Sequence, residues 1–303
     1  MAIKPSVLPA YAELQCFSHY TFLRGASSPE QLVQRAKDLG YHALAIVDEC
    51  TVAGIVKAHI AAKEAGLKLV IGSQMVITPE DGSAPFSLLI LAMNKNGYGN
   101  LCELITVARM RADKGSYIVR PRDIAAPPPF LVALRGMPDC QLVLLSAYGV
   151  DADALERQAA WLLQCAPGRA RIAMTLHFRS KDEKHKAIVA AVASQFDLPI
   201  VATGDVVMHL RSCKPLQDTM TAIRHSVPVS QCGYRLTSNA EQHLRSRVRL
   251  GNVYSREALD ETVRLADLCT FSLDELRYEY PLEIVPEGET AASYLRREAY
   301  LGA

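Results

Sequence analysis

The sequence predicts an α/β barrel built from alternating strands and helices. Short, near-continuous apolar runs recur along its 303 residues, and most are followed by a stretch in which apolar residues have helical spacing. Such strands are typical of a mostly parallel sheet that is covered on both faces. At least seven runs of this kind are present, which favours a barrel over a small open sheet. Half of all residues are apolar, which is enough to bury a sizeable core.

The first half of the chain supplies seven of the expected elements. The clearest is the helix after the first strand, where Ser28 is a suitable N-cap, Pro29 takes the first helical position and Gln31 completes a capping box. Gly40 then ends this helix. The expected strands in this half are 12–17, 42–48, 68–78 and 86–92, and the expected helices are 27–40, 52–66 and 96–112.

The same alternation continues through the second half of the chain. The segment PLEIVPEGE after residue 280 resembles a loop, and a last helix follows it to the end of the sequence. We therefore expect an N-terminal tail at 1–10, a barrel domain at 11–280 and a connecting segment at 281–303. The expected strands here are 130–134, 142–147, 171–177 and 198–205, and the expected helices are 151–166, 182–197, 214–225 and 255–269.

Composition indicates a cytoplasmic globular protein with no membrane segment. Lys plus Arg is 33 and Asp plus Glu is 32, so there is no general attraction to nucleic acid. The eight cysteines are scattered, no two closer than 19 residues, which excludes a CxxC zinc site and suggests a reducing compartment. Neither a signal peptide nor an apolar run of transmembrane length is present.

Polar residues follow several of the expected strands. In a parallel barrel the carboxyl ends of the strands converge on one mouth, where carboxylates and imidazoles could bind Zn²⁺, Mn²⁺ or Fe. The chain has no P-loop, no GxSxG and no HxH or HExxH pair. The residues at these strand ends are Gln15, Phe17, His19, Asp48, Glu49, Gln74, His177, Asp205 and His209.

These residues, like the basic stretch HLRSRVR and Cys50 elsewhere in the chain, also have structural interpretations. Asp48 could cap a helix or hold a turn, and a single histidine is often a loop or core residue. The basic stretch HLRSRVR, with Arg245 and Arg249, could contact phosphate, but a solvated helix face is the preferred interpretation. Cys50 follows two acidic residues, which would raise the pKa of its thiol rather than activate it.

Several blocks of the sequence resemble a known family. LQCFSHYTFLRGAS, ALAIVDECTVAGIVKAHIAAKEAGLKLVIGSQM, LLILAMNKNGYGNL and IVATGDVVMHLRSCKPLQDTMTAIR are similar to the N-terminal polymerase and histidinol phosphatase (PHP) domain of bacterial C-family DNA polymerases. FLRGAS, DECTVAG and GDVVMHLRSCKPLQD resemble the error-prone translesion branch in particular. The blocks keep the family order over about residues 11–303. The resemblance implies a distorted seven-stranded βα barrel with a metal cluster at its mouth.

The motifs that hold the metals in active members of that family are altered in this chain. The HxH pair falls on Gln15 and Phe17, an acidic position on Arg24, the histidine of TDH on Glu49, the glutamate of IGxE on Gln74 and the histidine of DxH on Val207; Asp48 and Asp205 match. Phenylalanine and valine cannot bind a metal, neutral amides are poor ligands for it, and arginine brings a fixed positive charge. We therefore expect a degenerate metal site without a metal or other cofactor, in which Arg24 pairs with Asp48, Glu49 or Asp205.

The resemblance implies a part of an error-prone DNA polymerase that acts in damage-induced translesion synthesis. The catalytic carboxylates and Mg²⁺ would belong to a palm domain beyond residue 303. The chain itself would be a structural or docking domain with no catalysis of its own. Its partners would be the rest of the polymerase, DNA through that enzyme, and mutasome proteins. Two alternatives stay open. One is a module whose mouth binds a partner peptide. The other is a metal-dependent phosphoesterase or 3′–5′ proofreading nuclease that uses Glu49 and Asp205 together with the substitute ligands His19, Asp48, His177 and His209.

Overall fold

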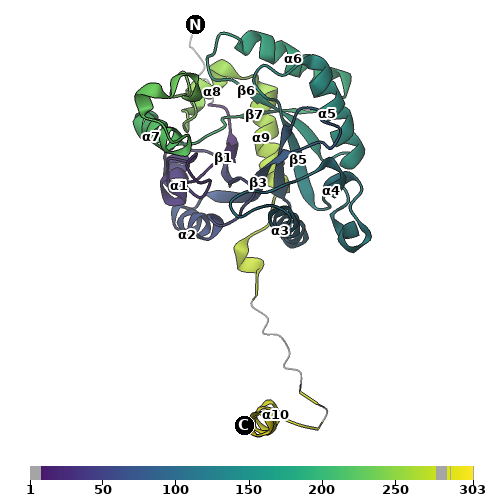
Figure 1. Cartoon of the computed structure of the whole chain (residues 1–303). Helices are drawn as coiled ribbons and strands as arrows, with labels where there is room; N and C mark the ends of the chain where they lie inside the picture. Colours follow the sequence, from purple (N-terminus) through teal and green to yellow (C-terminus); the bar gives the residue numbers. More distant parts are fainter. Residues whose placement is uncertain (1–7, 278–284, 287, 303) are drawn as a thin grey trace. The chain divides into compact units, whose positions relative to one another are not determined.

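The computed structural model describes residues 8–277, 285–286 and 288–302. Their contacts divide the chain into two compact units, one up to Leu273 and one from Asp274 onward. The first unit contains the whole sheet (Figure 1). Most of the expected tail, residues 1–7, and the expected domain boundary at residue 280 lie outside the described residues.

The described residues of the first unit form a seven-stranded sheet in which the strands lie in chain order. Neighbouring strands are parallel, except that β4 is antiparallel to both β3 and β5. The predicted mostly parallel sheet is therefore confirmed, with one reversed strand. The strands are β1 (Ala12–Cys16), β2 (Ala43–Ile46), β3 (Lys68–Ile77), β4 (Phe86–Ala92), β5 (Cys140–Leu145), β6 (Ala170–Thr175) and β7 (Ile200–Thr203).

Helices surround this sheet in Figure 1. The first of them begins as predicted, because Ser28 and Gln31 form a reciprocal capping box with Pro29 at the first helical position. The helices are α1 (Pro29–Asp38), α2 (Ile55–Ala65), α3 (Lys95–Met110), α4 (Pro121–Ala125), α5 (Ala152–Cys165), α6 (Asp182–Gln195), α7 (Lys214–Arg224), α8 (Arg247–Val253), α9 (Arg256–Leu268) and, in the second unit, α10 (Ala291–Leu301). Short 3₁₀ segments are η1 (Pro129–Leu134), η2 (Arg211–Cys213), η3 (Val229–Gln231), η4 (Gly233–Arg235) and η5 (Leu273–Glu275).

The sheet closes into a barrel where β1 meets the chain after β7. The Phe17 amide donates to the Val206 carbonyl at 2.8 Å, and the Val206 amide donates to the Gln15 carbonyl at 2.8 Å. Below this bridge, the Glu13 carboxylate accepts from the Gln15 amide at 2.9 Å and from the Gly204 amide at 3.1 Å. The buried Glu13 side chain thus replaces part of the backbone pairing between the two segments. Burial raises the pKa of the Glu13 carboxyl, and the hydrogen bonds from Gln15 and Gly204 oppose that rise.

Alternate residues of most strands fill the interior of the barrel. Leu14, Ala45, Leu89 and Val143 belong to this interior cluster, and Leu265 of α9 packs against them. Helix α9 also bonds to β1, because the Ala12 amide donates to Thr262 Oγ1 at 3.0 Å. A second, larger cluster lies between the outer face of the sheet and the surrounding helices. Both faces of the sheet are therefore covered, which explains the continuous apolar runs.

One expectation was wrong, and a second one holds only in part. The run 130–134 is not a strand but part of η1, because Leu131 and Leu134 are buried while Val132 between them is 55% exposed, a helical spacing. The basic stretch HLRSRVR is a solvated helix face only in part: Arg247 and Arg249 lie on α8 and are partly exposed, whereas Arg245 precedes this helix. Arg245 is buried and donates to the Leu176 carbonyl at 3.0 Å and to Tyr254 Oη at 3.1 Å.

Candidate site at the mouth of the barrel

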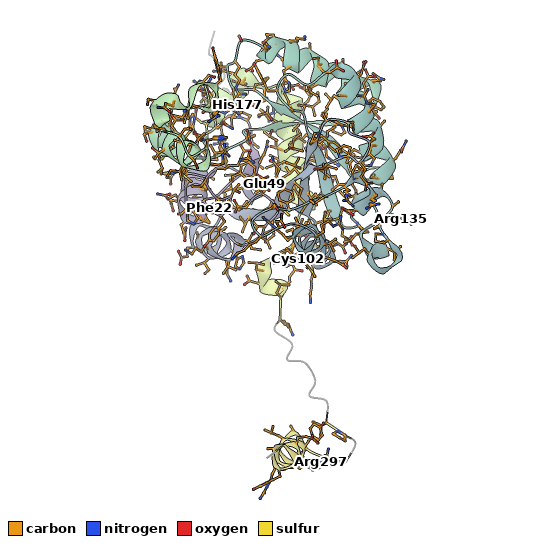
Figure 2. The ribbon with its side chains drawn as sticks, viewed as in Figure 1. Phe22, Glu49, Cys102, Arg135, His177 and Arg297 are labelled. Atoms are coloured by element: carbon orange, nitrogen blue, oxygen red, sulfur yellow. The ribbon has the colours of Figure 1, made fainter. Side chains whose placement is uncertain are left out.

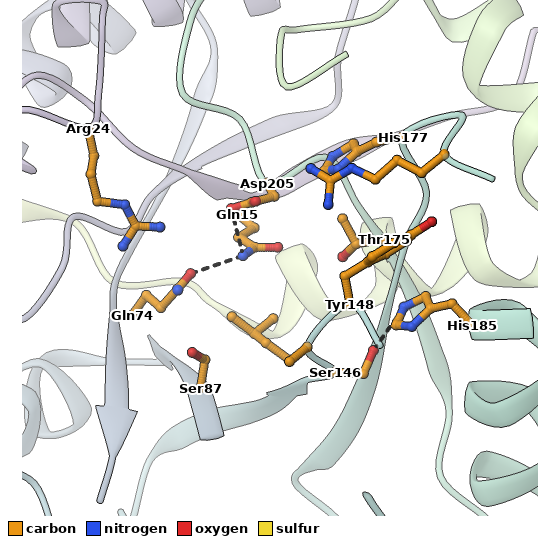
Figure 3. Close-up of a pocket in the computed structure, with 13 residues that line it drawn as sticks. Gln15, Arg24, Gln74, Ser87, Ser146, Tyr148, Thr175, His177, His185 and Asp205 are labelled. Carbon is orange, nitrogen blue, oxygen red and sulfur yellow. Dashed lines mark hydrogen bonds between the residues drawn. The ribbon is translucent and has the colours of Figure 1, made fainter. Parts of the chain in front are cut away.

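A network of amides joins the strand ends at the mouth. Gln15, which lies in a β-bulge between Glu13 and Cys16, donates from Nε2 to Gln74 Oε1 at 2.9 Å and to Asp205 Oδ1 at 3.2 Å (Figure 3). Gln242 donates to the other oxygen of Asp205 at 2.6 Å. Two altered motif positions, Gln15 and Gln74, and the retained Asp205 are therefore joined through one atom, Gln15 Nε2. The Asp205 carboxylate already accepts hydrogen bonds on both oxygens.

Apolar packing and an ion pair occupy the other altered positions. Phe17 and Val207 are buried in one cluster with Ala26 and Met208. The Arg24 guanidinium lies over the Phe17 ring, 4.7 Å from its centre, and pairs with the Glu49 carboxylate. Of the three expected partners of Arg24, Glu49 is thus the one it contacts.

Glu49 is held from two sides. Tyr117 Oη donates to Glu49 Oε1 at 2.8 Å, while Arg24 pairs with the other oxygen. Arg109 donates to the Glu49 and Cys50 carbonyls at 3.3 and 3.2 Å. In the view of Figure 2, Glu49 lies within the ring of helices. The side chain that stands in place of a metal-binding histidine is therefore engaged in local bonds.

Asp48 holds a turn, which was one of its two expected roles. Its carboxylate accepts from the Ser18 amide at 2.8 Å, from Ser18 Oγ at 2.7 Å and from Thr21 Oγ1 at 2.7 Å. Burial raises the pKa of this carboxyl, and the hydrogen bonds from Ser18 and Thr21 act in the opposite direction. The Asp48 carboxylate thus orders the β1–α1 connection.

The three candidate histidines lie in different surroundings. His19 is exposed and packs against Tyr20. His209 forms a 2.7 Å hydrogen bond between Nδ1 and Ser27 Oγ, and burial lowers its pKa. His177 is buried, shares a 2.9 Å hydrogen bond from Nε2 with the Gly204 carbonyl, and has a pKa lowered mainly by burial. Of these histidines only His177 lines the mouth cavity.

The mouth cavity has a volume of about 170 Å³. It brings together the predicted residues Gln15, Arg24, Gln74, His177 and Asp205. It also includes residues that sequence reasoning missed, although several directly follow β5 and β6, where the strand-end rule could have found them. These additional residues are Ser87, Leu145, Ser146, Ala147, Tyr148, Thr175, Arg179 and His185.

The residues at the mouth do not fit a metal cluster. Within the part of the chain that the structure describes, no three His, Cys, Asp or Glu side chains are grouped so that they could hold a metal ion. The Gln15 Nε2 atom is a donor directed at Gln74 and Asp205, and a guanidinium stands at the edge of the cavity. The buried Gln15 Oε1 has no partner among the described residues, and an ordered water could donate to it.

Comparison with known proteins places the chain in a family. A family model described as the PHP domain matches residues 13–197. The error-prone DNA polymerase of Bordetella parapertussis is 53% identical over 298 residues, which are 98% of this chain and 28% of that protein. The error-prone DNA polymerase of Ralstonia nicotianae is 51% identical over 303 residues, which are 99% of this chain and 28% of that protein. An amidohydrolase structure from Chromobacterium violaceum has a TM-score of 0.48 and 16% identity, covering 66% of this chain and 88% of that one.

The match to the PHP model covers more than half of the 303 residues and includes β1 to β6. The chain spans about 28% of the length of the curated polymerases it resembles. None of the described helices is both long and apolar enough to span a bilayer. The observed βα barrel and the family match agree, and the chain therefore belongs to the PHP domain family.

Proposed function

We propose that this chain is the N-terminal PHP domain of an error-prone DNA polymerase and serves that enzyme as a structural domain. The observation that carries the proposal is the mouth itself. Gln15 joins Gln74 and Asp205 there through hydrogen bonds, and Phe17 packs against Val207 beside them. Hydrogen bonds and apolar packing between side chains thus stabilise the region where a metal cluster would otherwise be bound.

The names of the relatives support the polymerase context. In both polymerases described above, the segment that is similar to nearly the whole of this chain makes up about 28% of the protein. Nucleotide addition during damage-induced translesion synthesis would then take place in a palm domain elsewhere in that protein, with Mg²⁺ bound there. The partners would be the rest of the polymerase, DNA and mutasome proteins, and the compartment would be the cytoplasm.

The geometry does not favour the phosphoesterase or nuclease alternative. Its ligands would be His19, Asp48, Glu49, His177, Asp205 and His209, of which only His177 and Asp205 line the mouth cavity, and the Asp205 carboxylate accepts from Gln15 and Gln242. Asp48 uses its carboxylate for the β1–α1 connection, and His209 bonds to Ser27. A hydrolytic metal site would require these groups to leave their present partners.

Metal analysis of the purified chain tests the proposal. We expect less than one tenth of an equivalent of Zn, Mn or Fe, no change of the melting temperature in EDTA, and no nuclease activity in Mn²⁺ or Zn²⁺. The matched control restores the family ligands with Gln15→His, Phe17→His, Glu49→His, Gln74→Glu and Val207→His. This variant should bind metal and be less stable than the wild type without it. A stoichiometric metal in the wild type, or a melting temperature several degrees lower in EDTA, would contradict the proposal.

A further inference from the structure

We infer that a hollow beside the mouth cavity binds single-stranded DNA. The inference rests on the proposed function, since it concerns a domain of a DNA polymerase. The hollow has a volume of about 610 Å³ and lies between the β5–α5 and β6–α6 connections. Tyr148, Phe178, Arg179 and Lys181 line it. Tyr148 and Arg179 also line the mouth cavity, so the two spaces are neighbours.

Two aromatic rings in the hollow are partly open to solvent. Phe178 is 56% exposed and Tyr148 is 37% exposed. The Arg249 guanidinium lies 4.7 Å from the centre of the Phe178 ring, and the Arg179 guanidinium lies 4.8 Å from the centre of the Tyr148 ring. Each ring is thus held by a cation. Unpaired bases stack on aromatic side chains presented in this way.

The backbone fixes Phe178 in its exposed position. Phe178 has a φ of +56°, in the left-handed region that a bulky residue rarely adopts. The adjoining segments are tied down by two hydrogen bonds: Asn239 Nδ2 donates to the His177 carbonyl at 2.6 Å, and the Lys181 amide donates to Tyr148 Oη at 2.9 Å. The rings are therefore presented on an ordered surface, at little further cost in conformational entropy upon binding.

The charge of the hollow favours a polyanion. Arg179 and Lys181 line it, and the exposed Lys184 follows in the first turn of α6. The ion pairs found in the described part of the chain involve none of these three cations. Two carboxylates lie close in sequence to these cations. The Asp182 carboxylate accepts from the His177 amide, and the Glu183 side chain is exposed.

Glu241 adds no net negative charge near the hollow. It pairs with Arg249 and with Arg211.

Single-stranded DNA fits this combination better than the other polyanions. Lys181 and Lys184 can contact phosphates, while the ring of Phe178 can accept an unpaired base, and the two kinds of contact alternate along a single strand. The Tyr148 ring, which contacts Arg179 and lies 5.7 Å from the His185 ring, is the less open of the two. In duplex DNA the base faces are already stacked on one another. An acidic peptide would use the cations but would gain little from the rings.

Fluorescence anisotropy with the purified chain and a labelled oligothymidylate of about 12 nucleotides tests the inference, since sites of this kind cover about 4–16 nucleotides. We expect Phe178→Ala and Phe178→Leu each to weaken binding about 5- to 150-fold, the range measured for loss of base stacking. Lys181→Ala should reduce the slope of log K against log salt concentration by about 0.7. Phe22→Ala, an 82% exposed phenylalanine that does not line the hollow, is the matched control and should bind as the wild type does.

Absence of binding in 50 mM salt would overturn the inference, and so would equal weakening by Phe178→Ala and Phe22→Ala. Tighter binding of a duplex of the same length, or equal competition by polyglutamate, would also overturn it. Urea unfolding of each variant separates loss of binding from loss of folding. These outcomes leave the structural role untouched, because that role is tested by metal content and by the response to EDTA.

Discussion

Replacing Gln74 by glutamate places a carboxylate in the mouth without changing the size of the side chain. Gln74 is 5% exposed, and its Oε1 accepts from Gln15 Nε2 at 2.9 Å. The same nitrogen donates to Asp205 Oδ1 at 3.2 Å. Because both bonds share one nitrogen, an oxygen of the new carboxylate and the Asp205 carboxylate would lie within about 6 Å of each other. Their repulsion and the burial of a new charge both favour the protonated form.

The expected size of the effect follows from that distance. Two like charges about 6 Å apart repel by about 3 kcal/mol at an effective dielectric constant near 20. This energy corresponds to a rise of about 2 units in the pKa of the new carboxyl in the folded state, from an unfolded value of about 4.3. Since the folded pKa is raised, the destabilisation is full above the folded pKa and vanishes below the unfolded one. We expect Gln74→Glu to lose about 3 kcal/mol at pH 8 and about 1 kcal/mol at pH 5.

Urea unfolding of wild type and variant at both pH values measures this difference. Gln164→Glu on α5 is the matched control, because Gln164 is exposed and the same chemical change should alter stability by at most about 0.5 kcal/mol at either pH. Equal losses at pH 5 and pH 8 would refute the reasoning, since they would mean that solvent screens the two carboxylates. A gain in the stability of the wild type at pH 8 on adding micromolar Zn²⁺ would also refute the reasoning, because it would mean that the unaltered mouth binds a metal.

Three further results are expected. Phe17→Ala should lower the free energy of unfolding by about 3–5 kcal/mol, since Phe17 is fully buried, whereas Phe22→Ala should change it by less than about 0.5 kcal/mol; urea unfolding measures both. Arg245→Leu should lower it by about 3 kcal/mol or more, because the buried Leu176 carbonyl and Tyr254 Oη lose a charged donor and Glu13 loses a nearby positive charge; a fully folded variant of wild-type stability would contradict this. Arg24→Met should cost about 1 kcal/mol or less, since its pair with Glu49 is partly exposed, and a double-mutant cycle measures that pair.

Local patterns were sufficient to predict most of the fold. The capping box of Ser28 and Gln31 located α1, and the alternation of strands and helices predicted a barrel. The run 130–134 was not decidable locally, because five consecutive apolar residues fit a strand and a buried helical turn equally well. What settles it is which side chains the surrounding structure buries, here Leu131 and Leu134. The burial of Arg245 likewise depends on partners far away in the sequence.

The candidate site was predictable where it depends on strand ends and not where it depends on later elements. Gln15 lies one residue before the end of β1, and His177 and Asp205 follow β6 and β7. Gln74 lies within β3, and all four residues line one cavity. His185 comes from within α6 and reaches Ser146 at 3.2 Å, a contact set by the packing of that helix. Gln242 reaches Asp205 from a loop 37 residues further on. No repeating pattern in the sequence marks either contact.

The closure of the barrel has a consequence for synthesis on the ribosome. The Gly204 amide, which binds Glu13, lies 191 residues after it. At a translation rate of about 5–20 residues per second, roughly 10–40 s pass between the synthesis of β1 and that of the segment after β7 that pairs with it. During that interval one edge of β1 lacks its neighbour, and such an edge can pair with another chain. The nascent domain is therefore most exposed to misassembly just before β7 is made, and slowing translation upstream of residue 200 should increase its aggregation.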